Sequence, residues 1–275
     1  MTPNDRRRRR LITAAIVLPT MQALAADLPP SAQNSPMWLK LRVQLFQDKP
    51  IIENGAKLIE LSAPERAEDA AVVPVAIKTL AAQTPDRYIK TIHLILDNNP
   101  GPVAAVFHMT PESGRADIET RVRVEQYTHL RAVVEMNDGA LSMSTLYLKA
   151  SGGCSVPVGK DGAEPAASLG KMKLALQEQP KRNQSVMAQL MIRHPNLSGL
   201  AMNQLTRLYE PPHFVRKVEV AYSGKPVMTA DLDFSISENP HFRFYFTPKS
   251  DGVLTAQIQD SHDLSFKTSL KVAPQ

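Results

Sequence analysis

The feature that most constrains the fold is a series of short, β-rich runs separated by turn residues. In the first half of the chain these runs are 57–61, 72–79, 88–96, 103–109, 116–124, 130–136 and 140–149. The run 116–124 (ADIETRVRV) alternates apolar and polar residues, which is the period of a strand with one buried face. Asp138 and Gly139 join the last two runs, and this pair supplies the positive φ values of a tight hairpin turn. Short strands spaced in this way predict a sandwich of two antiparallel sheets.

The second half repeats the pattern on a smaller scale. Its β-rich runs are 184–194, 214–222, 225–233, 241–246, 253–260 and 263–272. Ahead of the first sandwich, residues 37–47 carry apolar side chains at helical spacing, and Ser35 and Pro36 form a helix start signal. The sequence therefore predicts an all-β chain of two Ig-like antiparallel β-sandwich domains in tandem, with a short N-terminal helix after a signal peptide.

The predicted domain boundaries follow changes in composition along the 275 residues. We assign residues 1–25 to a signal peptide, 26–150 to the first sandwich, 151–180 to a linker that contains the GGC sequence, and 181–275 to the second sandwich. Residues 156–165 are rich in Pro, Gly and charged side chains, which is typical of a linker. Within the linker only 169–177 has the composition of a helical turn or a brief strand.

The N-terminus has the composition of a secretory signal. Five arginines, Arg6 to Arg10, precede a short apolar run and a small-residue cleavage site at Ala25. The apolar run is shorter than the ~20 residues of a membrane span. Cleavage after Ala25 would lower the formal net charge from +5 to +1, so the basic balance belongs to the signal and nucleic acid is not an expected partner. We expect a periplasmic protein without a membrane span, exported by the Sec or the twin-arginine route.

Cys154 is the only cysteine in the chain and follows Gly152 and Gly153. A single cysteine forms no internal disulfide, and its glycine neighbours leave the backbone free to move. We predict that Cys154 is a reactive thiol on a flexible arm formed by Gly152 and Gly153. The alternative is a small buried hydrophobe, since free cysteine is among the most buried residue types.

No catalytic or cofactor motif stands out beside this cysteine. Lys149 and Lys160 are the only nearby cations in sequence that could stabilise a thiolate, so we expect no enzyme activity and no cofactor. The seven histidines have no metal-ligand spacing, and no metal site is expected. A copper-binding alternative rests on His108, His194 and the eleven methionines. Packing and hydrogen bonding explain these residues more simply, and we expect His194 to hold a turn or an interdomain contact.

Four sequence elements of the second half occur together in a known family. They are IRHP at 192–195, PPHF at 211–214, YSGKPV at 222–227 and SENP at 237–240. This half resembles SoxZ, one part of the SoxYZ sulfur carrier of bacterial thiosulfate oxidation. The first half is similar to SoxY in 63–75, 110–126 and 132–139 and in the strand that ends at GGC. With both halves in one polypeptide, the chain resembles the quinoprotein dehydrogenase-associated SoxYZ-like carriers.

The resemblance implies a role for each part. In SoxY the cysteine lies on a glycine-flanked C-terminal arm and carries sulfur intermediates as covalent adducts between enzymes, so Cys154 would be the attachment site and Gly152 and Gly153 the arm. The SoxZ half would pack against the SoxY half and help enzymes of sulfur oxidation, or of a quinoprotein dehydrogenase system, to dock. One departure is that Ser155 follows the cysteine and the chain continues, whereas the SoxY arm ends in a free tail.

Two functions from different classes follow. The first is a periplasmic carrier that holds sulfur intermediates on Cys154 and presents them to partner enzymes of the thiosulfate-oxidation type. The second is a non-catalytic Ig-like adaptor or chaperone for an exported quinoprotein dehydrogenase. The two differ in whether the function needs the thiol.

Overall fold

The structure is a computed structural model that describes residues 31–53, 58–156, 168–203 and 206–275. The predicted signal peptide and residues 157–167 of the predicted linker lie outside these residues. The only α-helix among the described residues is α1 (Pro36–Phe46), preceded by the 3-10 turn η1 (Ala32–Asn34). Ser35 caps α1 by accepting the Trp38 N–H, and Pro36 takes the first helical position. The predicted N-terminal helix is confirmed.

Apart from 3-10 turns, the regular secondary structure of the rest of the described chain is β, as predicted. The first half contains β1 (Ile51–Ile52), β2 (Ile59–Ser62), β3 (Val73–Thr79), β4 (Ile89–Leu96), β5 (Val103–Met109), the 3-10 turn η2 (Pro111–Ser113), β6 (Ile118–Val122), β7 (Thr128–Met136) and β8 (Leu141–Leu148). The second half contains β9 (Met172–Leu176), β10 (Val186–Ile192), β11 (Val215–Tyr222), β12 (Lys225–Leu232), β13 (His241–Phe246), β14 (Gly252–Asp260) and β15 (Ser265–Val272). Of the two alternatives for 169–177, a helical turn or a brief strand, the structure has the strand β9.

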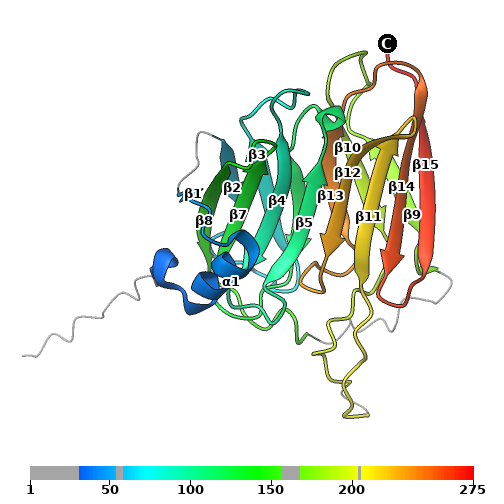
Figure 1. Cartoon of the computed structure of the whole chain (residues 1–275). Coiled ribbons are helices and arrows are strands. Elements are labelled where there is room, and N and C mark those ends of the chain that lie inside the picture. The colour runs from blue at the N-terminus through cyan, green and yellow to red at the C-terminus, as the bar shows by residue number, and fades with distance from the viewer. Residues whose placement is uncertain (1–30, 54–57, 157–167, 204–205) are drawn as a thin grey trace, which may run out of the picture.

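These strands form two layers that run through both halves (Figure 1). The nine-stranded sheet has the order β1-β8-β7-β4-β5-β12-β11-β14-β15, and the six-stranded sheet has the order β2-β3-β6-β13-β10-β9. All strand pairs are antiparallel except β1 with β8. The halves meet where β5 pairs with β12 in one layer and β6 pairs with β13 in the other. We call this line of pairing the seam.

The two sandwiches predicted in tandem therefore share both of their sheets. An unpaired sheet edge leaves N–H and C=O groups free to pair with another strand, and each half covers the edges of the other at the seam. The core is continuous as well: the rings of Phe107 on β5 and Phe242 on β13 meet across the halves at 6.2 Å between centroids. The two halves pack within one chain, as expected, and they do so through main-chain pairing.

Candidate functional site

The GGC segment leaves the end of β8 and lies flat against the chain that follows β6. The N–H groups of Gly152 and Gly153 donate to the carbonyls of Glu125 and Val124, both at 2.9 Å. A Cβ on Gly153 would stand 2.0 Å from the Ala70 carbonyl oxygen, so only glycine allows this close approach. Main-chain hydrogen bonds dock both glycines in this structure, and close packing adds to this at Gly153; a flexible arm at Gly152 and Gly153 stays a prediction.

Cys154 itself is buried, with 1% of its surface exposed. Its N–H donates to Glu125 Oε2 at 2.8 Å, and its carbonyl accepts from Ser198 Oγ at 2.5 Å. Ser155 adds two hydrogen bonds to the Glu125 carboxylate, from its N–H at 3.2 Å and from its Oγ at 2.9 Å. The residue thus lies between the first half, through Glu125, and the second half, through Ser198.

The expectation of an exposed sulfur is corrected by this geometry. A small pocket of about 30 Å³ lies beside Cys154 and draws its walls from both halves. Its lining residues are Ala71, Arg123, Cys154, Val156, Leu197, Ser198, Ala201 and Glu238. The sequence on either side of Cys154 shows no apolar periodicity, because the residues that bury this side chain come from distant segments of the chain. The alternative of a buried thiol describes this state.

Electrostatics around the sulfur oppose ionisation. Burial raises the pKa of the Cys154 thiol to about 12, Glu125 and Asp233 act in the same direction, and Arg123 opposes them. Lys149 ion-pairs with Glu65 at 2.7 Å, and it is not among the groups that shift the thiol. Lys160 lies outside the described residues. The docked thiol is therefore protonated at neutral pH and is a poor nucleophile.

Arg123 joins the halves beside this pocket. Its guanidinium donates to the carbonyls of Asn196, Phe234 and Ile236, all in the second half. Only 7% of its surface is exposed, and burial lowers its pKa. Four neighbours of the thiol could not be identified from the sequence. Glu125 and Ser198 stand 29 and 44 residues from Cys154. Arg123 and Asp233 lie in the predicted strand runs 116–124 and 225–233, where nothing marks them as neighbours of a thiol.

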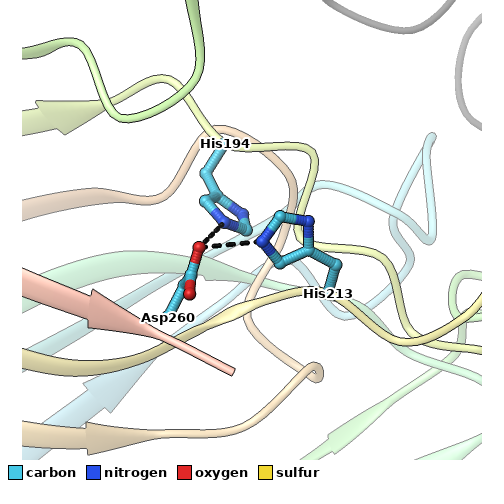
Figure 2. A group of neighbouring side chains, drawn as sticks. All are labelled: His194, His213 and Asp260. Carbon is cyan, nitrogen blue, oxygen red and sulfur yellow. Dashed lines mark hydrogen bonds and ion pairs between the residues drawn. The ribbon is translucent and has the colours of Figure 1, made fainter. Parts of the chain in front are cut away.

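A second polar cluster lies at the end of the IRHP element. Asp260 Oδ2 lies 3.5 Å from His194 Nε2 and 2.8 Å from His213 Nε2 (Figure 2). The other oxygen, Oδ1, accepts the N–H groups of His262 and Leu264, each at 2.9 Å. The fold thus gathers histidines that are far apart in the sequence, and no spacing motif could have predicted their meeting.

The hydrogen bonds of His194 argue against a metal site here. The ligand-type atoms of His194, His213 and Asp260 lie within 4.8 Å of one another, a separation that a metal ion could bridge. However, the Asn196 N–H donates to His194 Nδ1 at 3.0 Å, so the neutral ring carries its proton on Nε2. Burial, reinforced by His213, lowers the pKa of His194 to about 4, which keeps the ring neutral. Nε2 then donates to Asp260, and the cluster holds a turn, as expected of His194.

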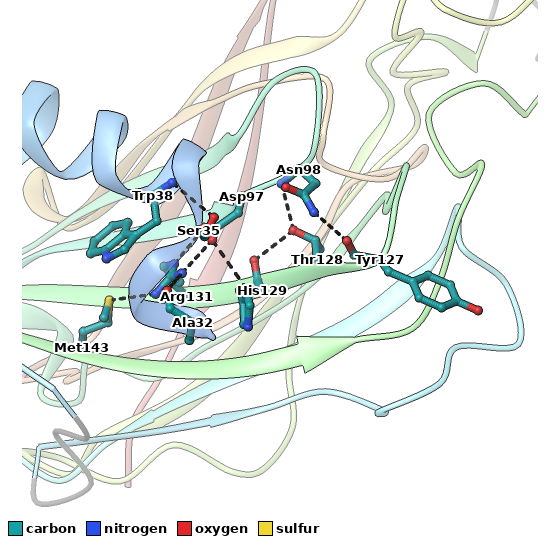
Figure 3. Close-up of polar contacts among 10 residues, drawn as sticks. All are labelled: Ala32, Ser35, Trp38, Asp97, Asn98, Tyr127, Thr128, His129, Arg131 and Met143. Carbon is teal, nitrogen blue, oxygen red and sulfur yellow. Dashed lines mark hydrogen bonds and ion pairs between the residues drawn. The ribbon is translucent and has the colours of Figure 1, made fainter. Parts of the chain in front are cut away.

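A third cluster fastens α1 to the outer face of the nine-stranded sheet. Arg131 donates to both oxygens of Asp97, at 2.8 and 2.7 Å, and to the Ala32 carbonyl at 2.6 Å (Figure 3). Its guanidinium also lies 4.4 Å from the centre of the Trp38 ring. Arg131 and Asp97 are both buried, and the contacts of Arg131 with Ala32 and Trp38 join η1 and α1 to the sheet, so this cluster is structural.

Fold and site together define a class: an all-β protein of two halves, joined edge to edge, that encloses a single thiol between them. Residues 42–154 match the family model of sulfur oxidation protein SoxY, and residues 172–271 match that of sulphur oxidation protein SoxZ. The chain therefore belongs to the SoxY and SoxZ families, with one domain of each in tandem. The SoxY match ends at Cys154.

Comparison with known proteins gives two further findings. The solved structure of the sulfur carrier protein SoxY from Chlorobium limicola f thiosulfatophilum is 26% identical and covers 41% of this chain and 94% of its own, with a TM-score of 0.35. Superoxide reductase (neelaredoxin) from Ignicoccus hospitalis is 18% identical over 38% of this chain and 80% of its own, with a TM-score of 0.28. No curated protein matches the chain. Among the described residues, no helix has the length and apolar character needed to cross a membrane.

Proposed function

We propose that this protein is a periplasmic sulfur carrier that holds sulfur intermediates covalently on Cys154 and presents them to partner enzymes of sulfur oxidation. The observation that carries the proposal is the place of the thiol: the only cysteine of the chain is the last residue of the SoxY match and sits between the SoxY and SoxZ domains. Burial of the thiol, with Glu125 and Asp233 acting in the same direction, suppresses its reactivity, so the chemistry belongs to the partners and not to this chain.

Carriage on Cys154 requires two positions of the arm. In the docked position the thiol is enclosed and protonated, which protects it, and any adduct small enough for the pocket, from unwanted reaction. Release breaks the hydrogen bonds of Cys154 and Ser155 to Glu125 and the bond from Ser198. In water the thiol would return toward its ordinary pKa of about 8.5 and could ionise.

Loading then follows simple chemistry. Joining Sγ to the terminal sulfur of thiosulfate removes the thiol proton and two electrons, and the oxidised redox centre of a partner enzyme accepts both electrons. The product is a disulfide-type bond that carries the sulfonate group. Partner enzymes of this kind are expected from the SoxY and SoxZ domains.

Intact-mass spectrometry tests the carrier. The mature protein is purified from its native periplasm without reductant and measured before and after reduction. A mass excess on Cys154 equal to sulfur, sulfonate or thiosulfonate units identifies the cargo and supports the proposal. A signal peptide that is still present contradicts the proposal. So does a Cys154 thiol that stays unmodified while sulfur oxidation is active. The Cys154→Ser variant is the matched control and should carry no adduct.

A second candidate is favoured by the burial of the thiol. A non-catalytic adaptor for an exported quinoprotein dehydrogenase would use both halves as a docking scaffold, with Cys154 as a small packing residue at the seam. In that case Cys154→Ser would leave dehydrogenase activity in cells unchanged. A carrier predicts instead that the same substitution abolishes growth on the sulfur compound.

A further inference from the structure

A groove of about 970 Å³ lies on the outer face of the six-stranded sheet, across the seam. The ladder between β6 and β13 contains only two residue pairs, Glu119 with Arg243 and Ile118 with Phe244. The pairing between the two halves is then interrupted, and a single β-bridge between Val122 and Ile236 joins them again. The groove lies over this break, so it exists only because the two halves are joined.

Cationic side chains dominate the polar lining of the groove. These cations are Arg121, Lys171, Lys173, Arg193 and Arg243, and the lining contains one carboxylate, Glu119. The chain expected after cleavage has a formal net charge of only +1, so positive charge is concentrated here. Cations gathered in a cleft with apolar walls raise the local concentration of anions.

The protein itself uses little of the hydrogen-bonding capacity of Arg121 and Arg243. Arg243 pairs with Glu119 at 2.8 Å, and Arg121 reaches the Asn239 carbonyl only at 3.4 Å. The Nε groups of both arginines are buried and have no hydrogen-bond partner within the described ranges. Burial, with the two arginines acting in the same direction, lowers the pKa of His241, which also lines the groove. Burial and the two arginines together therefore disfavour a further positive charge at this position in the groove.

The walls between the cations are apolar. Pro64 and Pro74 line the groove on the SoxY side, and Met172 and Met191 line it on the SoxZ side. A volume of this size is at the upper end of small-molecule sites, which combine apolar walls with a few placed polar groups. An inorganic anion would leave most of this space unfilled.

We propose that the seam groove binds a small organic anion with an apolar body and at least two acidic groups, carboxylate, sulfonate or phosphate. Arg121 and Arg243 contact one acidic group near the seam, and Lys171 and Lys173 contact another on the SoxZ side. The apolar body lies on Pro74 and Met191. This site is separate from the cysteine pocket: the two linings share no residue.

Fluorescence anisotropy with pyrenetetrasulfonate tests the proposal on the mature full chain. This probe combines an apolar ring system with several acidic groups, and a neutral pyrene sulfonamide serves as the uncharged comparison. We expect saturable one-to-one binding of the tetrasulfonate that weakens with added salt, and no binding of the neutral probe. Cys154→Ser should bind the tetrasulfonate as wild type does, which keeps this test independent of the carrier proposal.

Variants locate the site. Arg121→Gln combined with Lys173→Gln should raise the Kd about tenfold or more, because each charge-assisted contact is lost. Lys171→Gln with Lys173→Gln changes only exposed side chains and provides a second groove variant that should keep its fold. The matched control is Lys267→Gln with Lys271→Gln, two exposed lysines on β15 of the other sheet, for which we expect a change of less than about twofold.

Three outcomes would overturn the proposal. One is the absence of tetrasulfonate binding at low salt. Another is equal weakening in the β15 control and in the groove variants, since that reports general surface charge. The third is displacement of the probe by a short polyglutamate peptide that binds more tightly, which would assign the groove to an acidic segment of a partner protein.

Discussion

Removing the Glu125 carboxylate should release the cysteine arm. This side chain accepts three hydrogen bonds from the arm, from the Cys154 N–H at 2.8 Å, the Ser155 N–H at 3.2 Å and Ser155 Oγ at 2.9 Å. The arm keeps its bonds to the Val124 and Glu125 carbonyls in any Glu125 variant. The substitution therefore weakens docking of the residues around the sulfur while the main-chain contacts of the glycines remain.

The size of the effect follows from these three bonds. A hydrogen bond to a charged group contributes about 1.5–3 kcal/mol, and the bonds to the more exposed Ser155 contribute less because water replaces them. We take about 3 kcal/mol for Glu125→Ala, which multiplies the opening equilibrium by about 100. Glu125→Gln keeps one carbonyl acceptor and loses the charge, so an increase of about tenfold is expected.

The assay is the rate at which an aromatic disulfide reagent modifies Cys154 in the native protein. When arm closure is faster than modification, this rate is the opening equilibrium multiplied by the rate for a free thiol. The control is Glu60→Gln, an exposed carboxylate on β2 that does not contact the arm. Urea unfolding of each variant separates arm release from global unfolding. If Glu125→Ala reacts at the wild-type rate with an unchanged unfolding midpoint, then the carboxylate does not hold the arm and the reasoning fails.

Three further predictions concern packing, a buried ion pair and pH. Gly153→Ala should displace the arm, because its Cβ would stand 2.0 Å from the Ala70 carbonyl, and thiol modification should accelerate with little change in the urea midpoint. Arg131→Met should lower the free energy of unfolding by about 3–5 kcal/mol, because it leaves Asp97 charged and buried without its partner. Folding lowers the pKa of His194 from 6.5 to about 4, so its contribution to stability is present above pH 6.5 and is lost as the pH falls toward 4. Urea unfolding should show that the free energy of unfolding is about 1–2 kcal/mol lower at about pH 5.

Each of these has its own control. Arg131→Met combined with Asp97→Asn should cost less than Arg131→Met alone, because the unpaired charge is gone; equal costs would show that packing and not charge decides. His194→Gln should flatten the pH dependence between about pH 7 and about pH 5, and an unchanged slope would assign it to other groups. A wild-type modification rate in Gly153→Ala would mean that the arm tolerates a side chain at this close approach.

The all-β class, the N-terminal helix and the β7–β8 hairpin could be predicted because their causes are local. Ser35 and Pro36 start the helix, Gly139 adopts a φ of +87° between β7 and β8, and alternation along β13 sends Phe242, Phe244 and Phe246 to the core. Each signal lies within a few residues of the feature that it predicts. The order of the two domains is equally a property of the sequence, and both family models match it in that order.

The seam, the burial of Cys154 and the cationic groove were decided only by the tertiary structure. Strand β5 meets β12, and β6 meets β13, across more than a hundred residues of chain. Glycines beside a cysteine predict a flexible backbone when read alone, whereas here Gly153 allows the backbone to approach Ala70 closely beside the buried cysteine. The reactivity of a thiol depends on what covers it and which charges face it, and Glu125, Arg123 and Ser198 reach Cys154 from distant parts of the sequence. Burial and electrostatics are sums over spatial neighbours, and the fold alone determines those neighbours.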